Sequence, residues 1–117
     1  MTLPKIVWPY SLFQKAWNSV YFSGQIGINP DTWLLADTIE SQTIQACENI
    51  KIIAQEAWVE MKDIVKTTVF ITDMKEYGVV NDIYGKYFSH KPARSCVAVR
   101  ELPAGALVEI EVIAYIV

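Results

Sequence analysis

The chain has 117 residues with a formal net charge of −3 and a pI near 5.0; this length suits one folded domain, which we expect to span residues 1–117. Hydrophobic residues make up 52% of it, which excludes a disordered chain and, for so small a domain, indicates burial against another subunit. The acidic charge and the scattered basic residues argue against nucleic acid as a partner.

The N-terminal segment, residues 1–10, contains two prolines and lacks the uninterrupted apolar run of a signal peptide. It also lacks the Arg/Ser-rich composition of a transit peptide. Elsewhere no apolar stretch approaches the roughly 20 residues that span a bilayer. We therefore expect a cytoplasmic protein without a membrane partner.

A strand is predicted over residues 19–28, where Ser23-Gly24-Gln25 interrupts the apolar run. A turn cluster follows at residues 29–32. A long helix is then predicted over 37–58, with Asp37 or Thr38 as its N-cap. Its apolar stripe recurs at alternating spacings of four and three: Ile39, Thr43, Ala46, Ile50, Ile53 and Ala57.

The second half predicts a strand over 64–72, a helix over 74–89 ending before Pro92, and strands over 94–100 and 107–117. In the first of these strands Val65, Thr67, Val69 and Ile71 share one face. The order is β-α-β-α-β-β, with room for one more short strand near the N-terminus. Two helices cover only one face of such a sheet, so we expect an α+β fold with a parallel crossover joining strands 64–72 and 94–100.

The last two strands each combine an apolar side with a mixed one. In 107–117 the apolar side carries Val108, Ile110, Val112, Ala114 and Ile116, and the mixed side carries Glu109, Glu111, Ile113, Tyr115 and Val117. In 94–100, Ser95, Val97 and Val99 alternate with Arg94, Cys96, Ala98 and Arg100. We expect the apolar sides to face the helices and the mixed sides to form a subunit interface with polar clefts.

Taken singly, these residues have ordinary structural interpretations too. Arg/Glu pairs across strands are usually solvated or structural ion pairs. Cys96 alone is more often a small core residue than a nucleophile, and His90 at a helix end is more often a surface or capping group than a base. Two cysteines and one histidine are too few for a disulfide framework or a zinc site, so we expect neither metal nor cofactor.

The string Lys91-Pro92-Ala93-Arg94-Ser95-Cys96-Val97 resembles the most characteristic motif of the Rid/YjgF family, the reactive intermediate imine deaminases. Further segments resemble family motifs in the same order: Tyr21-Phe22-Ser23-Gly24-Gln25-Ile26, the pair Gln42 and Asn49, residues 63–70, residues 80–84 and Val108-Glu109-Ile110-Glu111. The resemblance extends from about Trp8 to the C-terminus. It departs from the family pattern at Trp8-Pro9, at Trp33-Leu34 and in the short segment 89–92, all of which concern the rim of the cleft.

The resemblance implies a chorismate-mutase-like (YjgF-like) fold in a homotrimeric barrel, with ligand clefts between subunits. It implies cofactor-free hydrolysis of 2-iminobutanoate and 2-iminopropanoate to 2-oxo acids and ammonia. By motif, Arg94 matches the carboxylate-binding arginine and Glu109 the glutamate that attends the catalytic water. Tyr10 and Asn81 match residues that line the cleft, and Gly24 and Cys96 match positions whose main chain borders the ligand.

This chemistry suits these residue types. A planar guanidinium binds both oxygens of a carboxylate, which orients the neighbouring C=N carbon toward a positioned water. Two alternatives stay open: a protein that binds 2-oxo acids without turnover, and an endoribonuclease or translation inhibitor. The acidic pI and single histidine argue against the last.

A simple hairpin of the last two strands would pair Arg94 near Tyr115 and leave Glu109 about six residues, roughly 20 Å, away. Either another strand therefore lies between them, or the two side chains meet across subunits. We favour a composite site between subunits.

Overall fold

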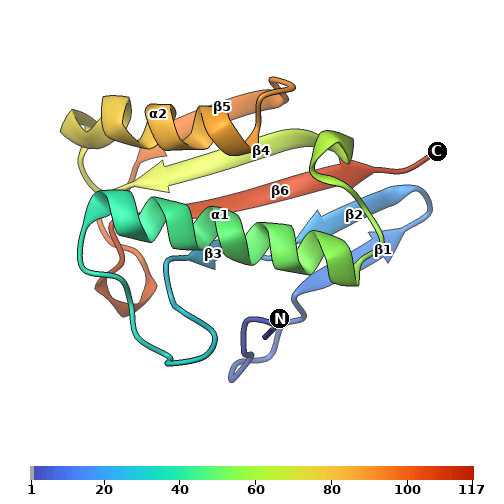
Figure 1. The fold of residues 1–117 in the computed structure, drawn as a ribbon, viewed down its shortest axis with the longest axis horizontal. Coiled ribbons are helices and arrows are strands. Elements are labelled where there is room, and N and C mark those ends of the chain that lie inside the picture. Colours follow the sequence, from blue (N-terminus) through green and yellow to red (C-terminus); the bar gives the residue numbers. More distant parts are fainter. Residues whose placement is uncertain (1) are drawn as a thin grey trace.

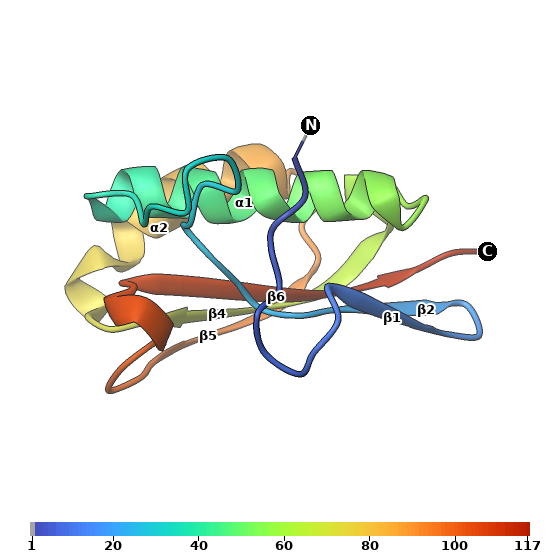
Figure 2. The same cartoon turned by 90° about the horizontal axis from the view of Figure 1, so that it is seen from below.

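The computed structural model describes residues 2–117; Met1 lies outside the described residues. Its strands are β1 (Phe13–Ala16), β2 (Ser19–Phe22), β3 (Gln25–Ile26), β4 (Ile64–Ile71), β5 (Ala93–Ala98) and β6 (Val108–Tyr115), and its helices are α1 (Ile39–Glu56) and α2 (Tyr77–Tyr87). Both helices lie side by side on one face of a mixed sheet (Figures 1 and 2). The predicted α+β architecture is confirmed. Neither helix is both long and apolar enough to cross a membrane within the described part of the chain.

The strand order is β1-β2-β6-β4-β5, with β3 also pairing with β6 (Figure 1). Strand β4 runs parallel to β5, which confirms the crossover through α2, and antiparallel to β6. It thus separates the last two strands of the sequence, which do not form a hairpin with each other. Of the two possibilities left open by the sequence, the first is therefore found: another strand lies between the strands that carry Arg94 and Glu109.

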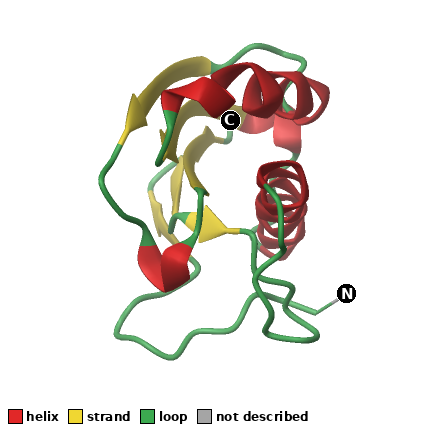
Figure 3. Cartoon of the chain, turned by 90° about the vertical axis from the view of Figure 1, so that its left-hand side faces the viewer, coloured by secondary structure: helices red, strands yellow, loops and turns green. Residues whose placement is uncertain are grey.

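The core lies between the sheet and the two helices, which form separate layers in Figure 3. The alternate residues Val108, Ile110, Val112 and Ala114 of β6 are all buried, as the two-residue period predicts. The predicted stripe of α1 is also buried, and Thr38 is its N-cap. The Thr38 hydroxyl accepts from the Ser41 amide at 3.1 Å, while the Ser41 hydroxyl accepts from the Thr38 amide at 3.0 Å, which forms a capping box.

The predicted strand 19–28 is in fact two short strands. Strand β2 pairs with β6 around Ile113–Tyr115, and β3 pairs with β6 at Glu109 and Ile110, so Ser23 and Gly24 span the gap between them. The prediction of one continuous strand is wrong because the chain leaves the ladder at this point and rejoins it further along β6. The additional N-terminal strand is confirmed as β1.

A β-bulge at the start of β4 changes the predicted face of one residue. Ile64 lies opposite Ala114 and Lys66 opposite Ile113, so Val65 has no partner of its own on β6. Ile64 is 1% exposed and Val65 is 50% exposed. The placement of Val65 on the buried face is therefore wrong, whereas Thr67, Val69 and Ile71 are buried as predicted.

Two buried amides of α1 hold β3 and the loop after it against the helix. The Asn49 amide donates to the carbonyls of Ile26 at 3.3 Å and Ile28 at 2.9 Å. The Gln42 amide donates to the Ala36 carbonyl at 3.0 Å, and its oxygen accepts from the Leu107 amide at 2.8 Å. These bonds provide partners for main-chain groups that lie outside the regular pairing of the sheet. Burying such a group without a partner costs about 1–3 kcal/mol.

Helix α1 ends in a Schellman motif whose left-handed position is a tryptophan. The Val59 amide donates to the Ala54 carbonyl at 2.9 Å and the Trp58 amide to the Gln55 carbonyl at 3.2 Å. Trp58 has a φ of 61° and its side chain is 88% exposed. Trp17 and Trp33 also occupy left-handed turn positions, where glycine is ordinarily preferred.

Gly27 allows β3 to approach α1 closely. A Cβ placed there would lie 2.5 Å from Gln42 Cα and 2.6 Å from the Gln42 carbonyl oxygen, which are main-chain atoms.

We expect Gly27→Ala to lower the free energy of unfolding by about 1–3 kcal/mol, as overpacking does. Gly85→Ala is the control, because a Cβ in that helical position meets no atom within 4 Å. It should raise the free energy of unfolding by roughly 0.5–1 kcal/mol. Urea titration measures both; equal stability of the two variants would contradict the close approach.

Candidate functional site

Arg94 lies on the helix-facing side of β5, beside α2. Its guanidinium donates to the Asn81 side-chain oxygen at 2.6 Å and to the Tyr77 hydroxyl at 2.9 Å. Its central carbon lies 4.8 Å from the ring centroid of Tyr84 and 5.5 Å from that of Tyr77. The three partners follow one another at spacings of four and three along α2, so they share one face of the helix. Arg94 is thereby held in a single orientation.

The guanidinium has no carboxylate partner within residues 2–117, where the one ion pair joins Lys62 and Glu60. Its neighbours are neutral oxygens and aromatic rings. A half-buried cation in this setting can still accept an anionic ligand, because two neutral acceptors orient it without cancelling its charge.

The expectation for the two sides of the strand over 94–100 is wrong. The mixed side, with Arg94 and Cys96, faces the helices, and Val97 on the apolar side is exposed. The polar groups and rings of α2 solvate the cation there. Burial raises the pKa of the Cys96 thiol, and the charge of Arg94 lowers it by a smaller amount. The thiol therefore stays protonated near neutral pH, which does not favour a nucleophile.

Glu109 lies on the other face of the sheet, away from the helices, because its neighbours in β6, Val108 and Ile110, point into the core. Its carboxylate rests against Gly24, where an added Cβ would lie 2.6 Å from Glu109 Oε2. Burial, and secondarily the charge of Glu111, raise the pKa of the Glu109 carboxyl above its usual range. A carboxyl of this kind is better suited to accept a proton near neutral pH than an ordinary glutamate.

A cavity of about 420 Å³ opens beside Glu109. The N-terminal segment supplies Trp8 and Tyr10 to its wall, and Gly24 and Pro103 complete it next to the carboxylate. Among the expected site residues, Tyr10, Gly24 and Glu109 are thus brought together.

The six expected residues therefore form two groups on opposite faces of the sheet. Arg94, Asn81 and Cys96 lie on the helix side. In the register of the sheet, Arg94 lies opposite Thr67 of β4, and Thr67 lies opposite Val112 of β6. Glu109 of β6 lies opposite Phe70 of β4. Within one chain the sheet lies between the Arg94 guanidinium and the Glu109 carboxylate.

Several neighbours of the site carried no separate signal in the sequence. Tyr77 and Tyr84 were not among the expected site residues, yet both contact Arg94. Their spacing from Asn81 could have indicated the shared face. Trp8 was noticed only as a departure at the cleft rim, and its place in the cavity wall depends on the path of the irregular N-terminal segment.

Comparison with known proteins places this arrangement in a family. A family model described as endoribonuclease L-PSP matches residues 2–116. A RutC family protein of Aquifex aeolicus is 45% identical over 114 residues, covering 95% of this chain and 91% of that protein. The crystal structure of RidA from an Antarctic Psychrobacter is 40% identical with a TM-score of 0.95, covering 98% of this chain and 94% of that one.

The chain belongs to the Rid/YjgF family. Another member, the 2-iminobutanoate/2-iminopropanoate deaminase of Salmonella typhimurium, is 39% identical over 115 residues, covering 95% of this chain and 90% of that protein. The Rid/YjgF resemblance drawn from the motifs is confirmed, and the family includes imine deaminases.

Glu111→Gln should lower the pKa of the Glu109 carboxyl toward its usual value. The substitution removes the second of the two causes that raise this pKa and leaves the burial in place. Carbon-13 NMR of side-chain-labelled glutamate measures the titration directly. Glu101→Gln, which alters an exposed glutamate outside the cavity, is the control. An unchanged titration of Glu109 in the Glu111 variant would contradict the charge interaction.

Proposed function

We propose that the protein is a cofactor-free deaminase that hydrolyses 2-imino acids, including 2-iminobutanoate and 2-iminopropanoate, to 2-oxo acids and ammonia. The observation that carries the proposal is Arg94, whose guanidinium is fixed by Asn81 and Tyr77 and is not paired with any carboxylate of the described chain. A substrate carboxylate is the complementary group. The similarity to the Salmonella 2-iminobutanoate/2-iminopropanoate deaminase supports the same reaction class.

In the proposed reaction Arg94 binds the carboxylate of the imino acid and orients its C=N carbon. A water molecule adds its oxygen to that carbon, and Glu109 takes the proton that the water releases. The C=N double bond becomes a C–N single bond and the nitrogen takes up a proton from solvent. Glu109 then returns its proton to the nitrogen. The C–N bond breaks as the C=O bond forms, the added hydroxyl releases its proton to solvent in place of the one taken up, and ammonia leaves. No oxidant or covalent enzyme intermediate is needed.

Because the sheet separates Arg94 from Glu109 in one chain, we propose that each site combines Arg94 of one subunit with Glu109 of its neighbour. The helix-free face of the sheet provides a surface for such association. Its residues include a series of exposed or half-buried apolar side chains that no element among residues 2–117 covers: Tyr21, Phe70, Val97, Ile113 and Tyr115. Monomers rarely expose so continuous an apolar surface. A homotrimer, which the family resemblance implies, would bury it.

Ribonuclease chemistry is less well supported by the arrangement. The ring Nε2 of His90 lies 2.9 Å from the Ile64 carbonyl oxygen, which engages it with the main chain. It is the one histidine of the sequence. RNA cleavage by acid–base catalysis ordinarily needs a second group of suitable pKa and cations for the phosphate.

The test is an assay in which a serine or threonine dehydratase generates the imine and its loss is followed. We expect acceleration over buffer, and a loss of about 100-fold or more in kcat/KM for Arg94→Ala, because this removes the group that orients the substrate. Glu109→Gln should lower kcat. Arg100→Ala, the other arginine of the chain, is the matched control. No acceleration by the wild type, together with binding of 2-oxobutanoate, would support a binding protein instead.

A mixing experiment tests the composite site. Neither Arg94→Ala nor Glu109→Gln should be active alone. When the two are refolded together, mixed oligomers contain interfaces in which both residues are native, so activity should return. If each chain carried a whole site, mixing would restore nothing.

A further inference from the structure

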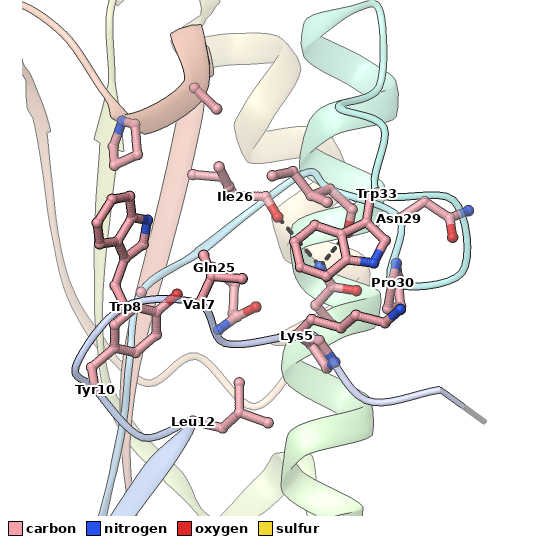
Figure 4. A pocket seen from close by; sticks show the side chains of 16 residues that line it. Lys5, Val7, Trp8, Tyr10, Leu12, Gln25, Ile26, Asn29, Pro30 and Trp33 are labelled. Carbon is pink, nitrogen blue, oxygen red and sulfur yellow. Dashed lines mark hydrogen bonds between the residues drawn. The ribbon is translucent and has the colours of Figure 1, made fainter.

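A second cavity, of about 220 Å³, lies at the edge of the sheet beside the one that holds Glu109 (Figure 4). Its walls come from the N-terminal segment, from β3 and the loop that follows it, and from Asn49 of α1. Figure 4 shows Trp8 and Tyr10 on one side of this space and Trp33 on the other. The reaction proposed above makes no use of it.

The two cavities are neighbours that share walls. The residues that line both of them are Trp8, Tyr10, Gly24, Ile26 and Pro103. Trp8 and Tyr10 are exposed side chains of an irregular segment, and the Glu109 carboxylate rests against Gly24. A ligand whose reacting carbon lies beside Glu109 could direct its remaining atoms past Trp8 into the second cavity.

Trp33 lines the second cavity in a strained backbone conformation. Its φ is 64°, a left-handed conformation that costs a residue with a Cβ about 1 kcal/mol or more. The turn that imposes this conformation is closed by bonds from the Trp33 amide to the Asn29 carbonyl at 2.8 Å and from the Asn29 amide to the Leu34 carbonyl at 3.0 Å. Lys5 lies 5.0 Å from the ring centroid and covers one side of the indole. Trp17 and Trp58 share this conformation, and Trp33 differs from them in that it lines the cavity.

The cavity also contains a polar group that the protein does not fully pair. Gln25 is 6% exposed, and its side-chain nitrogen donates to the Ser23 carbonyl at 3.3 Å. No described residue donates to its oxygen, although every fully buried side-chain polar atom among the described residues has a partner. The oxygen therefore keeps some exposed surface, and Gln25 is one of the residues that line the cavity. Asn49, by contrast, is occupied by the carbonyls of Ile26 and Ile28 and by Gln45.

We propose that this cavity is a side-chain pocket for aromatic substrates, so that the protein acts preferentially on 2-imino acids with an aromatic side chain. The inference rests on the deaminase function proposed above. An apolar cavity of about 150 Å³ admits benzene in another protein, and this one is larger. Trp8 and Trp33 line it with indole rings, which can pack against an aromatic group. The oxygen of Gln25 can accept a hydrogen bond from a phenolic hydroxyl at its far end.

Two glycine substitutions provide a matched test. Trp33→Gly removes the ring from the pocket and relieves the left-handed strain. Trp58→Gly relieves the same strain at a φ of 61° but lies outside both cavities. Both variants should unfold at or above the wild-type temperature, which controls for folding. A D-amino-acid oxidase generates the imines of alanine and phenylalanine in place, and semicarbazide traps whatever imine the protein leaves.

For the wild type and Trp58→Gly we expect kcat/KM to be about 10-fold or more higher for the phenylalanine imine than for the alanine imine. Trp33→Gly should lower this ratio about 10-fold. Calorimetric binding of phenylpyruvate and pyruvate gives a readout independent of turnover, and the same ratio should appear there.

The outcomes separate the two proposals. If the alanine imine is accelerated but the aromatic preference is absent, or is unaffected by Trp33→Gly, the pocket assignment fails and the deaminase function stands. If neither imine is accelerated, the deaminase function fails. The ratio of the affinities for phenylpyruvate and pyruvate then tests the pocket assignment by itself. Equal affinity for phenylpyruvate in the wild type and Trp33→Gly would overturn it.

Discussion

Successive residues of a strand point to opposite faces of a sheet, and this alternation determines what one copy of the chain can do. It directs Arg94 toward α2 and Glu109 away from it. The insertion of β4 between β5 and β6 then fixes their separation within the sheet. Each side chain has a structured environment of its own, so each half of the proposed site is formed in the single chain. The single chain does not bring the two halves together.

The two halves are built in chemically different ways. Around Arg94, neutral acceptors and aromatic rings orient a cation while leaving its charge available. Around Glu109, burial against Gly24 and the nearby Glu111 make the charged form of the carboxyl less favourable. One half is thus suited to an anion and the other to the uptake of a proton. The proposed hydrolysis of a carboxylate-bearing imine uses both properties.

The edge of the sheet near β3 is where the fold deviates most from regular structure. The chain leaves the sheet after Phe22, returns for two residues, and is then held to α1 by the buried amides of Gln42 and Asn49. This arrangement keeps main-chain groups paired while opening space between the N-terminal segment and the loop that carries Trp33.

The sequence by itself determined the order of the elements from α1 onward, the stripe of α1 and the alternation of β6, and it narrowed the cap to Asp37 or Thr38, because these depend on neighbours within a few residues. Its motifs also indicated Arg94, Glu109 and their companions as candidates. Only the tertiary structure decided the bulge at Val65, the break at Gly24, the helix-facing side of Arg94 and the place of β4 between the last two strands. Each of these depends on pairing and packing between residues far apart in the chain, which local periodicity does not specify.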